Sequence, residues 1–188
     1  MLGTTKIRLA AAIISGFLVI GCSPASAQVK NLKLNGQVAF TSDAPLELIK
    51  ASSRSLTGTI DPSTGVFAFM LHIRSFSGFN GGLQQEHFNE KYMESDRYPT
   101  ASFTGKIIDP VNFASNGEYE VRAKGKLNIH GQEQVRIIKC RLSVKDGILS
   151  VKSDFRVPLA DHNITIPRIV SEKIATEIDV TLAASTLQ

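Results

Sequence analysis

Apolar and polar side chains alternate along residues 118–129, and this period of two constrains the fold more than any other feature of the 188-residue chain. The apolar members are Tyr119, Val121, Ala123, Leu127 and Ile129. Successive side chains of a β-strand point to opposite faces, so the segment predicts a long strand with one face in the interior and one in water. A single wet face is typical of an antiparallel sheet.

Similar alternation recurs in segments that are separated by turn signals. Asp61–Gly65 carries a proline and a glycine at positions that favour a turn, and Asp146–Gly147 is a hairpin signal. The pattern predicts one all-β domain of about eight antiparallel strands, arranged as an up-and-down barrel or a sandwich. We favour the barrel, because closure leaves no exposed strand edges.

One predicted strand changes parity along its length. Val135 and Ile137 share one parity, whereas Ile138, Cys140 and Leu142 share the other. Such a shift indicates either a β-bulge or a change in what covers the strand.

The segment from Gln84 to Phe103 interrupts the β pattern. Glu86, Glu90 and Glu94 recur every four residues, and Phe88 and Tyr92 share another side, as on an amphipathic helix. Tyr98-Pro99 ends this pattern, because a residue before proline is pushed out of the α region. Alternation then resumes, so the sequence predicts a short helical insert that leads into a strand, with its acidic residues facing outward.

The N-terminal segment has the features of an export signal. Lys6 and Arg8 precede an apolar run from Leu9 to Gly21, which is too short to span a bilayer. Two cleavage sites compete: a lipobox ending at Cys22, which predicts lipidation of that cysteine and a signal of residues 1–21, and an A-x-A site that predicts a signal of residues 1–27. The barrel domain is then residues 28–188, in the periplasm or anchored to the outer membrane.

Charge and chemistry narrow the function further. Removing residues 1–27 takes away two basic residues and no acids, so the net charge falls from +4 to +2, and the remaining basic residues are spread along strands. This disfavours nucleic-acid binding. His87 and Glu90 form one H-x-x-E motif without a partner motif, so no metal site or other cofactor is predicted. No G-x-S-x-G motif is present, and Cys140 lies in a strand, so no enzymatic activity is predicted.

Aromatic and apolar residues gather around the helical insert. They are Phe76, Phe79, Leu83, Phe88, Tyr92, Met93, Tyr98 and Phe103. Two interpretations remain open: a hydrophobic plug beneath a lid, or the lining of an apolar ligand pocket at the mouth of a barrel.

Three motifs together resemble the YceI-like lipid-binding domain family over residues 30–186. The first is the segment from Phe88 to Tyr98-Pro99, followed by Ala101, Phe103 and Gly105; the second is Gly125–Gly131, read Gly-Lys-Leu-Asn-Ile-His-Gly. The third is the group of closing-strand residues: Phe155, Val157, Leu159, Asp161, Ile164, Ile174, Ile178, Val180 and Leu182. The chain has no Trp and reads Asn35–Phe40 where many members carry one, which places it nearer the shorter version of the domain.

The resemblance implies an extended lipocalin-like barrel of about eight strands with a helical insert at its mouth. It also implies an exported bacterial protein that holds a polyisoprenoid or another long-chain lipid, with no catalytic residues.

We therefore expect a non-enzymatic binding protein whose partner is an apolar ligand inside the barrel, and whose membrane association comes from Cys22. The alternative is a structural envelope protein with a packed barrel and no ligand. The inward parity of the strands and of the insert selects ten ligand-binding candidates: Phe40, Phe67, Phe69, Leu71, Phe88, Tyr92, Phe103, Tyr119, Val121 and Phe155.

Overall fold

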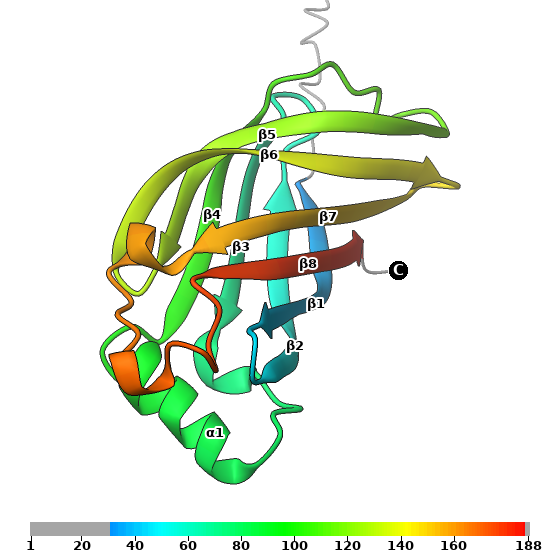
Figure 1. The fold of residues 1–188 in the computed structure, drawn as a ribbon. Helices are drawn as coiled ribbons and strands as arrows, with labels where there is room; N and C mark the ends of the chain where they lie inside the picture. Colours follow the sequence, from blue (N-terminus) through cyan, green and yellow to red (C-terminus); the bar gives the residue numbers. More distant parts are fainter. Residues whose placement is uncertain (1–30, 187–188) are drawn as a thin grey trace, which may run out of the picture.

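The computed structural model describes residues 31–186, which form one closed barrel of eight antiparallel strands in sequential order (Figure 1). The strands are β1 (Leu32–Asp43), β2 (Leu48–Ile60), β3 (Val66–His72), β4 (Thr100–Ile107), β5 (Gly117–Ile129), β6 (Gln132–Lys145), β7 (Ile148–Pro158) and β8 (Glu177–Thr186). The predicted all-β, lipocalin-like barrel is confirmed. The predicted export signal and Cys22 lie outside the described residues.

The connections alternate between the two ends of the barrel. One end carries the turns after β2, β4 and β6, and we call it the packed end. The other, the mouth, carries the turns after β1 and β5 together with two longer connections. The connection from β3 to β4 contains η1 (Ile73–Ser75), α1 (Gly82–His87) and the π-helix η2 (Phe88–Tyr92). The connection from β7 to β8 contains η3 (Leu159–His162) and η4 (Arg168–Val170). In Figure 1, α1 lies across the mouth.

The period of two produces the interior. In β5, Val121, Ala123 and Leu127 are buried, whereas Lys124 and Lys126 are exposed. Because each strand contributes alternate residues to the inside, the barrel encloses an apolar core contributed by its strands.

The parity change in β6 has a simple cause. β5 and β6 pair without a register shift from Gly117↔Val144 to Ile129↔Gln132, so the expected bulge alternative is wrong for this pair of strands. Val135 and Ile137 lie on the outer face and are exposed. A register shift instead lies between β1 and β2, where Gly36 pairs with Leu56 and Val38 with Ser53.

Two seams of the barrel are paired only near the packed end. β2 and β3 pair over four residues, from Thr57↔Met70 to Ile60↔Phe67. β6 and β7 pair over five, from Arg141↔Lys152 to Lys145↔Ile148. By contrast, β5 and β6 pair over thirteen. Toward the mouth, β6 and β7 separate, whereas β2 is joined to the segment after β3 by a single bridge between Ser52 and Ser77.

Side chains bridge the separated seams. The hydroxyls of Ser53 and Ser55 on β2 hydrogen-bond each other at 3.1 Å and the hydroxyl of Ser75 on η1, which follows β3, at 2.6 and 2.7 Å. Between β6 and β7, Ser153 donates to the carbonyl of Lys139 at 2.7 Å, and the Arg136 guanidinium donates to the carbonyl of Arg156 at 2.8 Å. These contacts replace ladder hydrogen bonds that the strands no longer make.

Candidate functional site: an apolar cavity

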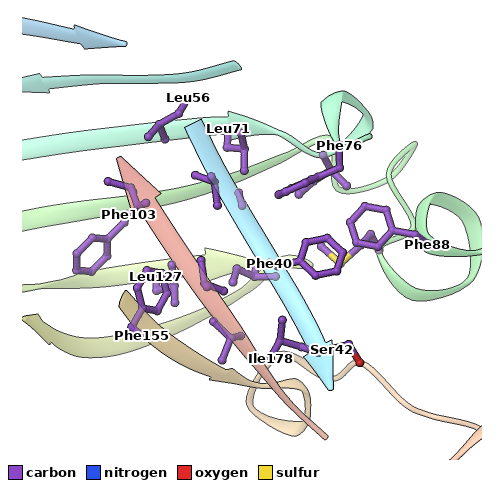
Figure 2. Close-up of a pocket in the computed structure, with 18 of the residues that line it drawn as sticks. Phe40, Ser42, Leu56, Leu71, Phe76, Phe88, Phe103, Leu127, Phe155 and Ile178 are labelled. Atoms are coloured by element: carbon purple, nitrogen blue, oxygen red, sulfur yellow. The ribbon is translucent and has the colours of Figure 1, made fainter. Parts of the chain in front are cut away.

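A cavity of about 660 Å³ occupies the interior between the core and the mouth (Figure 2). Its lining is overwhelmingly apolar and includes residues of all eight strands, the helical insert and the connection from β7 to β8. Cavities that hold small-molecule ligands commonly measure about 300–1,000 Å³. The barrel is therefore large enough to hold a molecule.

The cavity is long. Along β5, its lining runs from Val121 to Ile129, eight residue steps that span about 27 Å at roughly 3.4 Å per residue. At the packed end, Leu34 and Leu149 are almost completely buried, do not line the cavity and close the interior, while Ile60 and Leu142 form the adjoining part of the lining. At the mouth, exposed residues such as Leu83 and Lys173 belong to the lining, so the cavity reaches the surface there.

An aromatic cluster lies just inside the mouth. Phe88 of η2 stacks on Phe40 of β1, with ring centroids 5.4 Å apart, and contacts Phe76 at 5.7 Å and Phe79 at 5.1 Å. Figure 2 shows Phe40, Phe76 and Phe88 together, with Phe103 and Phe155 farther along the cavity. We call Phe40, Phe76, Phe79 and Phe88 the aromatic gate, because they lie between the insert and the deeper cavity.

The π-helix explains how the insert contributes three residues to the cavity. The amide of Met93 donates to the carbonyl of Phe88 at 2.9 Å, the spacing of a π-turn. This wider turn brings Phe88, Tyr92 and Met93 to one side, and all three line the cavity. Burial raises the pKa of the Tyr92 phenol. The spacing of four that the sequence suggested therefore holds only for the first part of the insert.

The acidic residues of the insert separate into two kinds. Glu86 and Glu90 are exposed, as expected. Glu94 follows η2 in a left-handed conformation, φ 42°, and its carboxylate lies 3.2 Å from Nε2 of His130. Since Nδ1 of His130 lies 3.0 Å from the carbonyl oxygen of His162, this imidazole connects the end of the insert to two other loops at the mouth. Glu94 therefore differs from Glu86 and Glu90: its side chain is 43% exposed and also contacts His130.

Nine of the ten candidate ligand-binding residues line the cavity. They are Phe40, Phe67, Phe69, Leu71, Phe88, Tyr92, Phe103, Val121 and Phe155. Whether these residues bind a ligand stays a prediction, but their positions surround one continuous apolar space.

Tyr119 is the exception. It is half-buried near the packed end, pairs with Leu142 across β5 and β6, and its hydroxyl donates to the carbonyl of Asn112 at 3.2 Å. Its parity is inward, as expected, since it packs against the core. Tyr119 lies at the boundary of the cavity, because its cross-strand partner Leu142 belongs to the lining and Tyr119 does not. Parity carries no information about where that boundary falls.

Several lining residues were not among the ten candidates. Phe76 and Phe79 belong to the group of aromatic residues around the insert, so the local composition already indicated them as possible lining residues. Val151, Ile178, Val180 and Leu182 come from β7 and β8, where inward parity alone would have found them.

Cys140 and Ser42 are among the few polar residues that line the cavity. Cys140 lines the cavity, and burial raises the pKa of its thiol, which keeps it in the weakly nucleophilic protonated form. Buried Ser42 accepts a hydrogen bond from the amide of Ala175 at 2.9 Å. Within residues 31–186, no three His, Cys, Asp or Glu side chains gather as metal ligands, and His87 and Glu90 are exposed.

The closed antiparallel barrel, its apolar interior and the helical insert at its mouth define a lipocalin-like barrel protein. The family model of the YceI-like domain matches residues 24–186, and the chain belongs to that family. A comparison with curated protein sequences gives no match. Over the part of the chain that the structure describes, no helix is long and apolar enough to cross a bilayer.

Two solved structures share the fold. One is a polyisoprenoid binding domain from Saccharophagus degradans, with a TM-score of 0.68 at 16% identity, over 83% of this chain and 98% of that one. The other is BcnA from Burkholderia cenocepacia, with a TM-score of 0.67 at 15% identity, over 81% and 96% of the two chains.

Proposed function

We propose that this chain is an exported, non-enzymatic binding protein that holds a long-chain apolar ligand, an isoprenoid or another lipid, inside the barrel. The observation that carries the proposal is the apolar cavity of about 660 Å³, which is open at the mouth and extends for about 27 Å along β5. The fold shared with the polyisoprenoid binding domain from Saccharophagus degradans supports the same ligand class.

The physical basis of binding is removal of apolar surface from water. Burial of a chain methylene contributes about 0.8 kcal/mol, so a long chain gains affinity in proportion to the length that the barrel encloses. The cavity supports this role over that of a structural envelope protein, because the interior of a purely structural barrel would be filled by its own side chains.

Mass spectrometry of organic extracts from the purified protein tests the proposal directly. We expect a long-chain lipid to co-purify, and we expect an apolar fluorescent probe to compete with it. Absence of both would refute the carrier function.

A matched pair of variants locates the binding site. Ala123 lines the cavity and is buried, whereas Ala68 lies on the outer face of β3 and is exposed. Ala123→Trp is expected to fill part of the cavity and lower probe affinity at least about tenfold, while Ala68→Trp leaves it unchanged. Equal effects of the two variants would show that the probe does not bind inside the barrel.

Export and lipid anchoring are part of the proposal and rest on the N-terminal sequence. Cys22 follows Val19-Ile20-Gly21, the pattern of a lipobox. If Cys22 is lipidated, Cys22→Ala releases the protein from the membrane fraction into the periplasm. Unchanged fractionation would favour cleavage after Ala27.

A further inference from the structure

Exposed aliphatic side chains surround the opening of the cavity. Leu46 lies in the turn after β1, Leu83 on α1 and Ile169 on η4, with exposed fractions of 65%, 65% and 91%. Leu48, at the start of β2, is also exposed. We call Leu46, Leu48, Leu83 and Ile169 the apolar rim.

Hydrogen bonds join the loops that carry this rim. The amide of Leu46 donates to the carbonyl of Glu172 at 2.9 Å, which connects the turn after β1 to the segment after η4. Asn80 Nδ2 donates to the carbonyl of Leu48 at 3.1 Å, and Gln84 Nε2 donates to Glu47 Oε1 at 2.8 Å. Three connections far apart in the sequence therefore hold the apolar rim together around one opening.

The apolar rim is continuous with the cavity. Leu83 is both exposed and part of the lining, and Glu47 and Val170, the neighbours of Leu46 and Ile169, line it as well. The other exposed large apolar residues lie away from the mouth loops: Val66 and Ile108 at the packed end, Val135 and Ile137 on the outer wall of β6, and Met70, which also lines the cavity, on β3.

We propose that the apolar rim docks the mouth of the barrel onto the surface of a lipid bilayer. This inference rests on the proposed function, because a ligand of low solubility must reach the cavity from a membrane. When the rim contacts the acyl region of the bilayer, the apolar cavity and the apolar bilayer interior become continuous. The chain of the ligand then passes from one to the other without crossing water.

The charges around the opening specify the kind of surface. Segments 43–48, 80–92 and 168–173 carry five acidic and three basic side chains: Asp43, Glu47, Glu86, Glu90, Glu172, Lys91, Arg168 and Lys173. A surface with excess acid gains nothing from anionic headgroups. The docking therefore uses apolar insertion and fits a zwitterionic bilayer.

Flotation with phosphatidylcholine vesicles tests the docking, using residues 28–188, which contain the complete closed barrel and lack Cys22. We expect the protein to float with the vesicles. Leu46→Asp combined with Ile169→Asp is expected to reduce binding at least about tenfold, because a charge replaces an inserting side chain at two positions. Neither residue lines the cavity, so binding of an apolar probe in solution stays within about twofold of the wild type.

The matched control is Val135→Asp combined with Ile137→Asp, at positions exposed by 66% and 58% on the side of the barrel. This variant is expected to float like the wild type. Equal loss of flotation in both variants, or none in the rim variant, would overturn the docking.

Three further outcomes test the docking. A requirement for phosphatidylglycerol in the vesicles would overturn the apolar mode of docking. If the wild-type protein binds the probe but does not float, the docking is overturned and the proposed function stands. If it floats but binds no probe, the proposed function is overturned and the docking stands.

Discussion

At the packed end, the hairpins β2–β3 and β6–β7 are paired next to their turns, and large aliphatic side chains fill the interior. At the mouth, the same strands separate, and aromatic side chains surround a cavity. Both ends have the same alternation of apolar and polar residues. The difference shows that the hydrogen-bond register, which sets how far the strands spread, decides whether an apolar interior is filled or hollow.

The largest effect is expected at the packed end. Leu149 is 2% exposed and does not line the cavity, and Leu149→Ala would leave a void that neighbouring side chains fill only in part. We expect a loss of about 2–5 kcal/mol in the free energy of unfolding, measured by urea denaturation. A loss below about 1 kcal/mol would mean that this end is not close-packed.

A smaller loss is expected in the aromatic gate. Phe88 is half-buried beside the cavity, so Phe88→Ala removes fewer contacts than the same change in a packed core. We expect about 1–2 kcal/mol of destabilisation and at least about tenfold faster release of a bound apolar probe, followed by stopped-flow fluorescence. Unchanged release would show that Phe88 does not obstruct the opening.

A buried histidine at the mouth is expected to make the free energy of unfolding sensitive to acid. His162 is fully buried, and desolvation lowers its pKa in the folded state. In the unfolded chain the His162 imidazole binds a proton near pH 6.5, whereas in the folded protein it binds that proton only at lower pH. The free energy of unfolding therefore falls as the pH drops below about 6.5, by at most about 1.4 kcal/mol per pH unit.

His162→Gln removes this titration. We expect its free energy of unfolding to change less than that of the wild type between pH 7.5 and 5.5, whatever its stability at neutral pH. Parallel curves for the two proteins would contradict the assignment.

The smallest effect is expected at the exposed turn of the packed end. Hydrogen bonds from Ser63 and Thr64 lower the pKa of Asp61 from 3.8 to about 2. The stabilising contribution of this carboxylate is present above pH 3.8 and is lost as the pH falls toward 2. Asp61→Asn should therefore change the free energy of unfolding only slightly. In acid unfolding, the difference in this free energy between the variant and the wild type should shrink only below about pH 4. A difference that already shrinks near pH 6 would point to another group.

Parity accounts for most of what was predictable about the site. Phe67, Leu71 and Val121 face the interior because each occupies an inward position in an alternating strand. The same rule selected Tyr119, which does not line the cavity although its cross-strand partner Leu142 does. A one-dimensional pattern identifies the face of a strand but does not locate a residue along a channel that eight strands build together.

The helical insert shows a second limit. Its amphipathic spacing indicated a helix, and α1 is present with Glu86 exposed. The π-turn at Phe88–Tyr92 places Phe88 against Phe40 of β1, and the left-handed Glu94 contacts His130. Local periodicity does not contain those contacts.

The sequence by itself determined the antiparallel strands, their inward faces and the position of the insert, because these follow from the period of two and from the Tyr98-Pro99 break. Only the tertiary structure decided that the mouth is hollow, that four phenylalanines meet beneath the insert, and that Leu46, Leu83 and Ile169 surround the opening. The physical reason is that volume and proximity depend on how strands distant in the sequence pair and separate, and side-chain alternation does not encode that spacing.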